Sequence, residues 1–240
     1  MNKLKEICNI IYNTNEFSYL KNEEIYKRLD KIRDILINKW KESLCSDFSI
    51  YTHENYIAEL IICYYWFSGK LIKPAIKYFI DNKIDYTNMK TLDDYNGIGI
   101  STIDLKKEFK IKDLSYFNNC KNQIKIFEKL CTYYNIFDIK RDENRNGKYD
   151  LIFSFENIEH YRNPLEYFNI LMNILNPNGY IVYSQAFSNF SLGHFYTYFI
   201  EKTYYSNKKT ARKFNTIVRE YFDILYVGFN GRPIIIQKKE

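Results

Sequence analysis

The fold is decided by residues 149–184, which read YDLIFSFENIEHYRNPLEYFNILMNILNPNGYIVYS. The run from Tyr149 to Phe155 is apolar without alternation, which is typical of a strand that a parallel sheet buries on both faces. Pro164 suits the first turn of a helix that the pattern extends to Leu175. The turn residues Asn176–Gly179 then precede a second apolar run, Tyr180–Ser184. This stretch therefore predicts a strand, a helix and a second, parallel strand.

The same alternation continues on both sides of this unit. Before it, short apolar runs at 89–92, 114–117 and 136–139 alternate with helical patterns, which favours a doubly wound, mostly parallel α/β sheet. After it, the pattern predicts a long helical stretch and then two strands, 222–227 and 234–237. The connection between these two strands is too short to hold a crossover helix, so they must be antiparallel.

The N-terminal third of the chain has a different pattern, with few helix breakers. Apolar residues such as Leu20, Ile25 and Leu29 recur there at helical spacing. The sequence therefore divides into a helical N-terminal cap, residues 1–88, and an α/β domain, residues 89–240.

The composition argues against several classes of protein. The five cysteines form no CxxC pair, which argues against a disulfide framework or a zinc site and fits a reducing cytoplasm. No spacing of His, Cys and carboxylate residues indicates a metal site. The most apolar stretch, residues 57–67, is too short to span a bilayer, so we expect a buried helix and no membrane partner. These features predict a cytoplasmic protein, and none of them indicates an oligomeric state.

Nucleic acid is a weakly supported partner. The net charge of +6 is mild, and the aromatic content of 18% is also explained by biased codon usage. One basic cluster stands out, formed by Lys208, Lys209, Arg212 and Lys213. We interpret it as a solvated helix face, and a phosphate-contacting patch is the alternative.

Several motifs in the deciding stretch resemble the class I S-adenosylmethionine-dependent methyltransferases. Asp150 begins the fourth strand, and the Glu159-His160 pair stands where many small-molecule methyltransferases carry Glu-His. Asn163-Pro164 stands where the family usually has Asp-Pro. Residues 175–179 (LNPNG) stand where the family usually has Leu-Lys-Pro-Gly-Gly. The resemblance covers residues from about 88 to 239. It implies a seven-stranded, doubly wound sheet with an antiparallel last strand, and S-adenosylmethionine as the cofactor.

The cofactor loop of this family corresponds to residues 92–102, LDDYNGIGIST. The resemblance implies that Asp93 is the acid after the first strand and that Gly97 and Gly99 belong to the glycine-rich turn. Tyr95 then stands where the family has its first glycine, which allows positive φ and close approach to the ligand. A short glycine pattern alone is weak evidence for a cofactor site, but its place between a strand and a helix makes that evidence stronger.

Other cofactor contacts are implied at the ends of the second and fourth strands. Asn118 takes the place of the acid that binds the ribose hydroxyls, and an amide oxygen there lacks the charge that strengthens such bonds. Phe155 and Glu156 follow the fourth strand and are expected to contact the cofactor.

Candidate catalytic residues follow the fourth and fifth strands, where the switch point of such a sheet puts the site. Glu156 and His160 follow the fourth strand, and His160 is a candidate base because histidine ordinarily titrates near neutrality. The alternative is that Glu159-His160 only supports the loop. His194 follows the fifth strand, in the region that shapes the acceptor pocket in this family. Arg232, beside a tight turn, is expected at the surface.

Three functions remain open from the sequence. The first is methyl transfer to a small-molecule or nucleotide-sized acceptor, with the N-terminal helices as a cap over the site. The second is a catalytically inactive, methyltransferase-like protein that binds a ligand or partner, which Tyr95 and Asn118 favour. The third is an enzyme of this fold acting on nucleic acid or a modified nucleotide. A fold alone does not decide among them.

Overall fold

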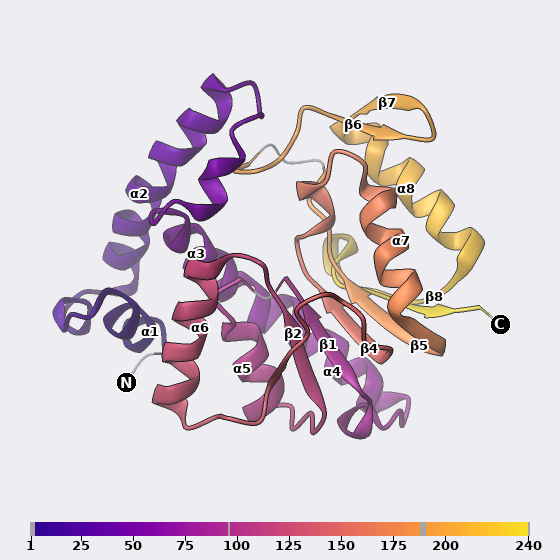
Figure 1. The fold of residues 1–240 in the computed structure, drawn as a ribbon, viewed down its shortest axis with the longest axis horizontal. Helices are drawn as coiled ribbons and strands as arrows, with labels where there is room; N and C mark the ends of the chain where they lie inside the picture. Colours follow the sequence, from indigo (N-terminus) through magenta and orange to yellow (C-terminus); the bar gives the residue numbers. More distant parts are fainter. Residues whose placement is uncertain (1–2, 96, 188–190, 240) are drawn as a thin grey trace.

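A computed structural model of the chain describes residues 3–95, 97–187 and 191–239. A seven-stranded sheet forms its centre, with the strand order β3-β2-β1-β4-β5-β9-β8 (Figure 1). Strands β1 to β5 are parallel to one another. Strand β9 is antiparallel to both of its neighbours, β5 and β8. The predicted fold class is therefore confirmed. The strands are β1 (Thr91–Asp94), β2 (Leu114–Phe117), β3 (Lys140–Arg141), β4 (Tyr149–Ser154), β5 (Leu175–Tyr183), β8 (Phe222–Val227) and β9 (Ile234–Lys238).

The central strands bury side chains on both faces of the sheet. Phe153 and Val182 share one core cluster with α4 (Lys73–Asp81) and α5 (Ile100–Lys107). The alternate residues Ile152 and Ile181 share another with α7 (Pro164–Ile174) and α8 (Asn207–Tyr221). Helices cover both faces of the sheet, which explains the unbroken apolar run at residues 151–153 in β4.

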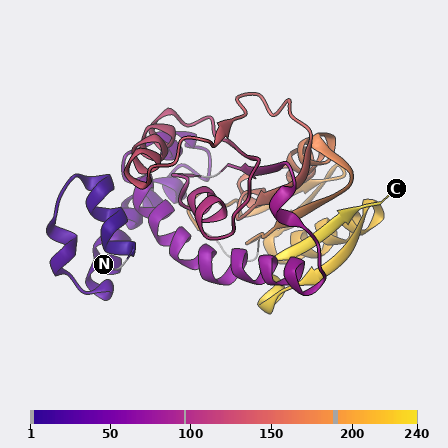
Figure 2. The same ribbon diagram turned by 90° about the horizontal axis from the view of Figure 1, so that it is seen from below.

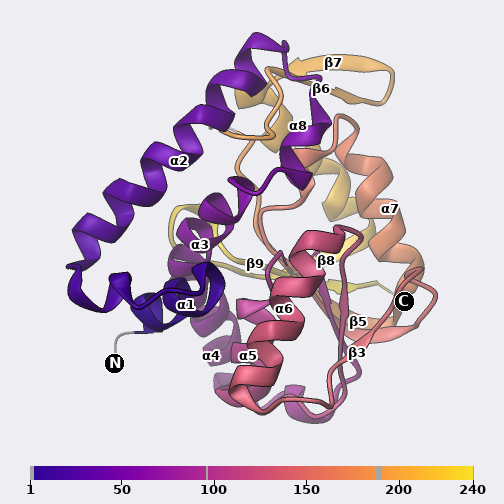
Figure 3. The same cartoon turned by 60° about the vertical axis from the view of Figure 1, so that its left-hand side comes forward.

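The N-terminal helices are α1 (Lys3–Tyr12), α2 (Asn22–Glu42) and α3 (Tyr56–Phe67). They lie at one end of the molecule and the C-terminal strands at the other (Figure 2). Helix α2 runs from α1 toward the segment around β6 (Thr197–Ile200) (Figure 3). There the buried Trp40 indole N–H donates to the backbone oxygen of His194 at 2.8 Å. The far end of α2 is therefore fixed to the segment that follows β5.

The proposed division of the chain at residue 88 stays a prediction. Helix α4 belongs to the N-terminal segment by sequence, yet its Ile76 and Phe79 pack in the same cluster as strands β4 and β5. Within the described residues, none of the helices combines the length and the apolar character that a membrane span requires.

Several predicted elements differ from the structure. The first strand is Thr91–Asp94 instead of 89–92, and the turn predicted at 176–179 lies within β5. The third strand is Lys140–Arg141 instead of 136–139, because Asn135 ends α6 (Lys121–Tyr134) in the left-handed conformation and Ile136 folds back to bond Cys131. The long helical stretch before α8 contains a hairpin, in which β6 pairs with β7 (Thr203–Ser206). Its turn residues Glu201 and Lys202 both have positive φ, which suits a tight hairpin but which their residue types do not signal.

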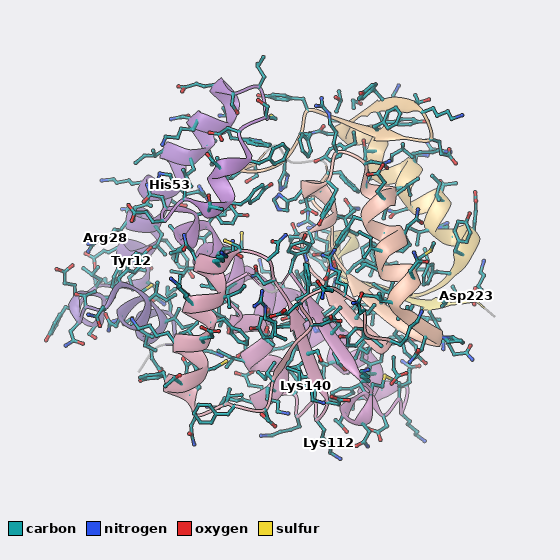
Figure 4. The ribbon with its side chains drawn as sticks, in the orientation of Figure 1. Tyr12, Arg28, His53, Lys112, Lys140 and Asp223 are labelled. Carbon is teal, nitrogen blue, oxygen red and sulfur yellow. The ribbon has the colours of Figure 1, made fainter. Side chains whose placement is uncertain are left out.

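The carboxyl ends of the parallel strands meet at one edge of the sheet. Lys112, which precedes β2, and Lys140, which begins β3, both lie at the lower edge of the molecule (Figure 4). The parallel strands therefore run toward the opposite edge, where the loops after β1, β2 and β4 come together.

Candidate functional site

A cavity of about 840 Å³ lies at the carboxyl edge of the sheet. Loops after β1, β2, β4 and β5 line it on one side, and residues of α3 such as Tyr56, Leu60 and Cys63 line it on the other. Its size is within the usual range of small-molecule sites. Eight of the predicted site residues line this cavity: Asp93, Tyr95, Gly97, Asn118, Phe155, Glu156, His160 and His194.

Gly99 is the predicted site residue that does not line the cavity. It precedes α5 with a φ of 77°, and a Cβ at this position would overlap the ring of Phe127 in α6. This glycine is therefore required by the close packing of α5 and α6.

Tyr95 keeps the backbone conformation of the glycine that it replaces. Its φ is 52°, in the left-handed region that costs a side chain about 1–2 kcal/mol. The side chain is held on several sides, because Tyr161 donates a hydrogen bond to its hydroxyl at 2.8 Å and Phe117 meets its ring edge-on at 5.0 Å between centroids. Tyr95 therefore adopts a backbone conformation that glycine favours.

A buried ion pair lies directly behind this turn. Arg145 Nε donates to Asp94 Oδ1 at 2.8 Å, and the Asp94 side chain is fully buried. The guanidinium also lies over the rings of Phe117, at 3.9 Å, and Tyr95, at 4.4 Å, and the Tyr167 hydroxyl donates to Asp94. Burial would lower the pKa of Arg145, but the Asp94 carboxylate raises it above the usual value. Burial raises the pKa of Asp94, and Arg145 beside it opposes that shift. Sequence reasoning missed this pair, because Arg145 lies in a polar loop far along the chain.

Asp93 is buried at the end of β1. Its Oδ2 accepts hydrogen bonds from Thr102 at 2.6 Å and Ser101 at 2.9 Å, both on α5. Burial raises the pKa of Asp93, the two hydroxyls oppose this shift and the neighbouring Asp94 adds to it, and the resulting pKa is about 7. A cation placed beside a carboxyl with such a pKa strongly favours its ionised form at neutral pH.

Asn118 connects the glycine turn to the start of α6. Its Nδ2 donates to the Gly97 carbonyl at 2.7 Å and to Gln123 Oε1 at 3.0 Å, and its Oδ1 accepts from the Cys120 N–H at 2.8 Å. An ionised aspartate has no N–H for the Gly97 carbonyl. These bonds explain why an amide replaces the acid of the family pattern.

His160 and His194 lie side by side, with ring centroids 5.1 Å apart. Burial and, to a smaller extent, the neighbouring His194 lower the pKa of His160 to about 3, so His160 is neutral at neutral pH. This contradicts the reason for which the sequence favoured His160, namely an unperturbed pKa near neutrality. Tyr51, from the N-terminal segment, places its hydroxyl 3.1 Å from His160 Nδ1. Gly193 has a φ of 79°, and a Cβ there would overlap that hydroxyl, so the glycine allows the two histidines to approach.

Glu159 lies behind the two histidines and is fully buried. Its Oε1 accepts from the Ala186 N–H at 3.1 Å and lies 3.9 Å from His194 Nε2. Potential ligand atoms of Glu159, His160 and His194 all lie within 4.8 Å of one another. The spacing along the chain predicted no metal site, because it does not show that the loop after β5 folds back onto the loop after β4.

Arg232 reaches the cavity, contrary to the expectation that it lies at the surface. Its Nη1 lies 3.2 Å from Glu156 Oε1 and 3.1 Å from Oε2. The turn before β9 thereby contributes a cation to the site, which the hairpin pattern alone did not indicate.

His53 and the basic cluster lie outside the cavity lining. His53 accepts a hydrogen bond from the Asn55 N–H at 3.1 Å, and it lies with the N-terminal helices (Figure 4). In the basic cluster, Lys208, Lys209 and Arg212 are exposed on α8, and Lys213 Nζ pairs with Glu201 at 2.6 Å. This arrangement supports the interpretation as a solvated helix face.

Comparison with known proteins gives a family and several similar structures. The N-methyltransferase NodS from Bradyrhizobium japonicum WM9, solved with S-adenosyl-l-homocysteine, has a TM-score of 0.47 at 10% identity, covering 85% of this chain and 99% of NodS. An rRNA methylase from Streptococcus thermophilus has a TM-score of 0.45 at 12% identity, covering 72% of this chain and 99% of its own. A methyltransferase from Pyrococcus furiosus has a TM-score of 0.46 at 12% identity, covering 72% of this chain and 87% of its own. A search of curated proteins found no match.

The family match covers strands β1 to β5 and the loops that follow them in the candidate site. A model described as a methyltransferase domain matches residues 88–221, which is more than half of the chain. This match includes both the glycine turn and the Glu159-His160 loop, which carried the resemblance in the sequence. The chain therefore belongs to the class I S-adenosylmethionine-dependent methyltransferases.

Proposed function

We propose that the chain transfers a methyl group from S-adenosylmethionine to a small-molecule or nucleotide-sized acceptor that binds beneath the N-terminal helices. One observation carries this proposal. A single cavity is lined by Asp93, Gly97 and Asn118 at one part and by Glu156, His160 and His194 at another. Cofactor-type and acceptor-type residues therefore share one enclosed space.

The residues at the glycine turn fit the cofactor. The buried Asp93 carboxyl, whose pKa burial raises, suits the ammonium of the methionine part. The Asn118 amide oxygen, which has two lone pairs, would accept a ribose hydroxyl beside the Cys120 N–H. Phe155 is buried and supplies an apolar wall. When bound, the cofactor supplies a methyl group on a sulfonium, which is an activated leaving group.

The protein's part in such a reaction is mainly to position the acceptor and to accept a proton. His160 is neutral at pH 7, because burial lowers its pKa, and it would orient the acceptor through a hydrogen bond. His194 and the Glu156–Arg232 pair would orient the acceptor from the other sides. The N-terminal residues Tyr51 and Leu60 cover the cavity and reduce the access of water.

The alternative of an inactive binding protein rests on Tyr95 and Asn118. Tyr95 retains the glycine-like backbone, and Asn118 fastens the turn to α6. Both substitutions are thus compatible with cofactor binding. No arrangement among the described residues specifically favours nucleic acid, because the basic cluster faces solvent on α8.

Calorimetric titration with S-adenosylmethionine and, separately, with S-adenosylhomocysteine tests the proposal. We expect micromolar binding of both ligands by the full chain. Correctly folded protein that binds neither ligand would overturn the proposal in favour of the inactive alternative.

Asn118→Asp should weaken cofactor binding. The new carboxylate would face the Gly97 carbonyl without a donor, and an unsatisfied buried polar group costs about 1–3 kcal/mol. We expect a roughly tenfold higher Kd for S-adenosylmethionine by calorimetry, together with a lower melting temperature. Asn144→Asp is the matched control, because Asn144 is exposed and does not line the cavity. Tighter binding by Asn118→Asp would mean that the ribose contact outweighs the turn contacts.

A further inference from the structure

The carboxylate of Glu159 is incompletely satisfied within the protein. Its Oε2 is buried and has no hydrogen-bond partner among the described residues. A buried carboxylate oxygen without a partner is costly, so it requires a proton or a cation. The neighbouring imidazoles of His160 and His194 offer nitrogen lone pairs, and the potential ligand atoms of the three residues lie within 4.8 Å of one another.

We propose that Glu159, His160 and His194 bind one divalent transition-metal ion at the acceptor part of the cavity. Two imidazoles and one carboxylate form the donor set that zinc and related ions take in open, catalytic sites. Metal–ligand bonds of roughly 2.0–2.2 Å require the three side chains to close in on the ion. Their potential ligand atoms already lie within 4.8 Å of one another, so the movement that binding requires is small.

Neighbouring residues hold this donor set in place. The Tyr51 hydroxyl lies 3.1 Å from His160 Nδ1 and so fixes the orientation of that ring. The Trp40 indole holds the backbone of His194 at 2.8 Å. Such supporting contacts orient metal ligands and tune their basicity. Glu156 is not included among the ligands, because Arg232 already pairs with both of its oxygens.

The position of the ion indicates the class of acceptor, and this part of the inference rests on the proposed function. His160 and His194 line the cavity, whereas Glu159 lies behind them, so the open coordination positions face the acceptor. A bound divalent ion lowers the pKa of an oxygen that it contacts. The acceptor is therefore a hydroxyl compound. Its O–H bond breaks and the proton leaves to solvent, an O–C bond forms, and the C–S bond of the cofactor breaks to release S-adenosylhomocysteine.

Titration of the full chain with Co²⁺ tests the site without any need for the acceptor. Protein treated with a chelator and then freed of it should bind one Co²⁺ per chain, with visible absorption bands and a rise in melting temperature. Removing a supporting residue around a metal typically costs 10–100-fold in affinity, so Glu159→Gln and His194→Ala should raise the Kd for Co²⁺ by more than about 100-fold. His53→Ala should bind as the wild type does, because His53 does not line the cavity.

The wild-type titration tests the metal site even if a variant fails to fold. Wild-type protein that binds no Co²⁺, Zn²⁺ or Mn²⁺ would overturn the metal site and leave a shared proton as what satisfies Glu159. Equal Co²⁺ binding by folded Glu159→Gln and by wild type would also overturn it. A parallel titration of metal-free protein with S-adenosylmethionine separates the two proposals. Cofactor binding without metal binding would refute only the metal site, and metal binding without cofactor binding would refute only the proposed function.

Discussion

Arg145→Ala is expected to lower the free energy of unfolding by about 3–5 kcal/mol, which is the usual cost of leaving one buried charge without its partner. The Asp94 carboxylate is fully buried, and Arg145 supplies its counter-charge at 2.8 Å. The same guanidinium packs on Phe117 and Tyr95, so its removal also leaves space among these rings. Urea denaturation followed by circular dichroism measures the change.

Arg28→Ala is the control for the loss of an arginine. Arg28 pairs with Glu16 at the surface, where both side chains are more than half exposed, and such pairs contribute at most about 1 kcal/mol. Combining Asp94→Asn with Arg145→Ala should cost clearly less than the sum of the two single changes, because the charge left behind is then gone. A cost for Arg145→Ala no larger than that for Arg28→Ala would show that the pair is not a buried ionic contact.

Cofactor affinity should depend on pH through Asp93. Burial raises the pKa of this carboxyl to about 7 in the free protein, and an ammonium beside it would lower that pKa in the complex. Binding below pH 7 then requires loss of a proton, so the Kd for S-adenosylmethionine should rise roughly tenfold between about pH 8 and about pH 6. Calorimetry across this range measures the slope.

Asp93→Asn should remove both the affinity and its pH dependence. Truncating one member of a buried charge pair costs about 2–5 kcal/mol, which is roughly 30-fold or more in Kd. Asp81→Asn is the control, because Asp81 is an exposed carboxylate on α4. If Asp93→Asn left affinity unchanged, or if the slope persisted in it, Asp93 would not contact the cofactor.

The raised pKa of Asp93 also affects the stability of the free protein. This effect depends on pH in the opposite sense to cofactor binding. The folded pKa of Asp93, about 7, lies above its ordinary value of 3.8. The folded state therefore binds this proton more tightly, and the stabilisation is complete below the ordinary value and is lost as pH rises through about 7. As far as Asp93 is concerned, the free protein is more stable at mildly acid pH, whereas the cofactor binds more tightly at mildly alkaline pH.

The sequence predicts well what depends on neighbouring residues in the chain. The apolar run at β4 and the short connection before β9 each constrain one element and its direction. The glycine turn and the Glu159-His160 loop were recognised for the same reason. Their residues line one cavity because the carboxyl ends of parallel strands meet at one edge.

Contacts between distant segments could not be predicted in this way. Arg145 and Arg232 come from polar loops, and their partners Asp94 and Glu156 lie 51 and 76 residues away. A charged residue in a loop looks the same in the sequence whether it faces solvent or a buried carboxylate. The pKa of His160 is also a property of its buried surroundings, so its residue type alone led to the wrong value.

The contact between Trp40 and His194 gives the protein an optical reporter. The chain has two tryptophans, and the indole N–H of Trp40 bonds the backbone of a residue that lines the cavity. Indole emission responds to changes in hydrogen bonding and in local polarity. A ligand that shifts the loop around His194 therefore changes the fluorescence of a side chain on α2, and occupancy of the cavity can be followed in real time without a dye.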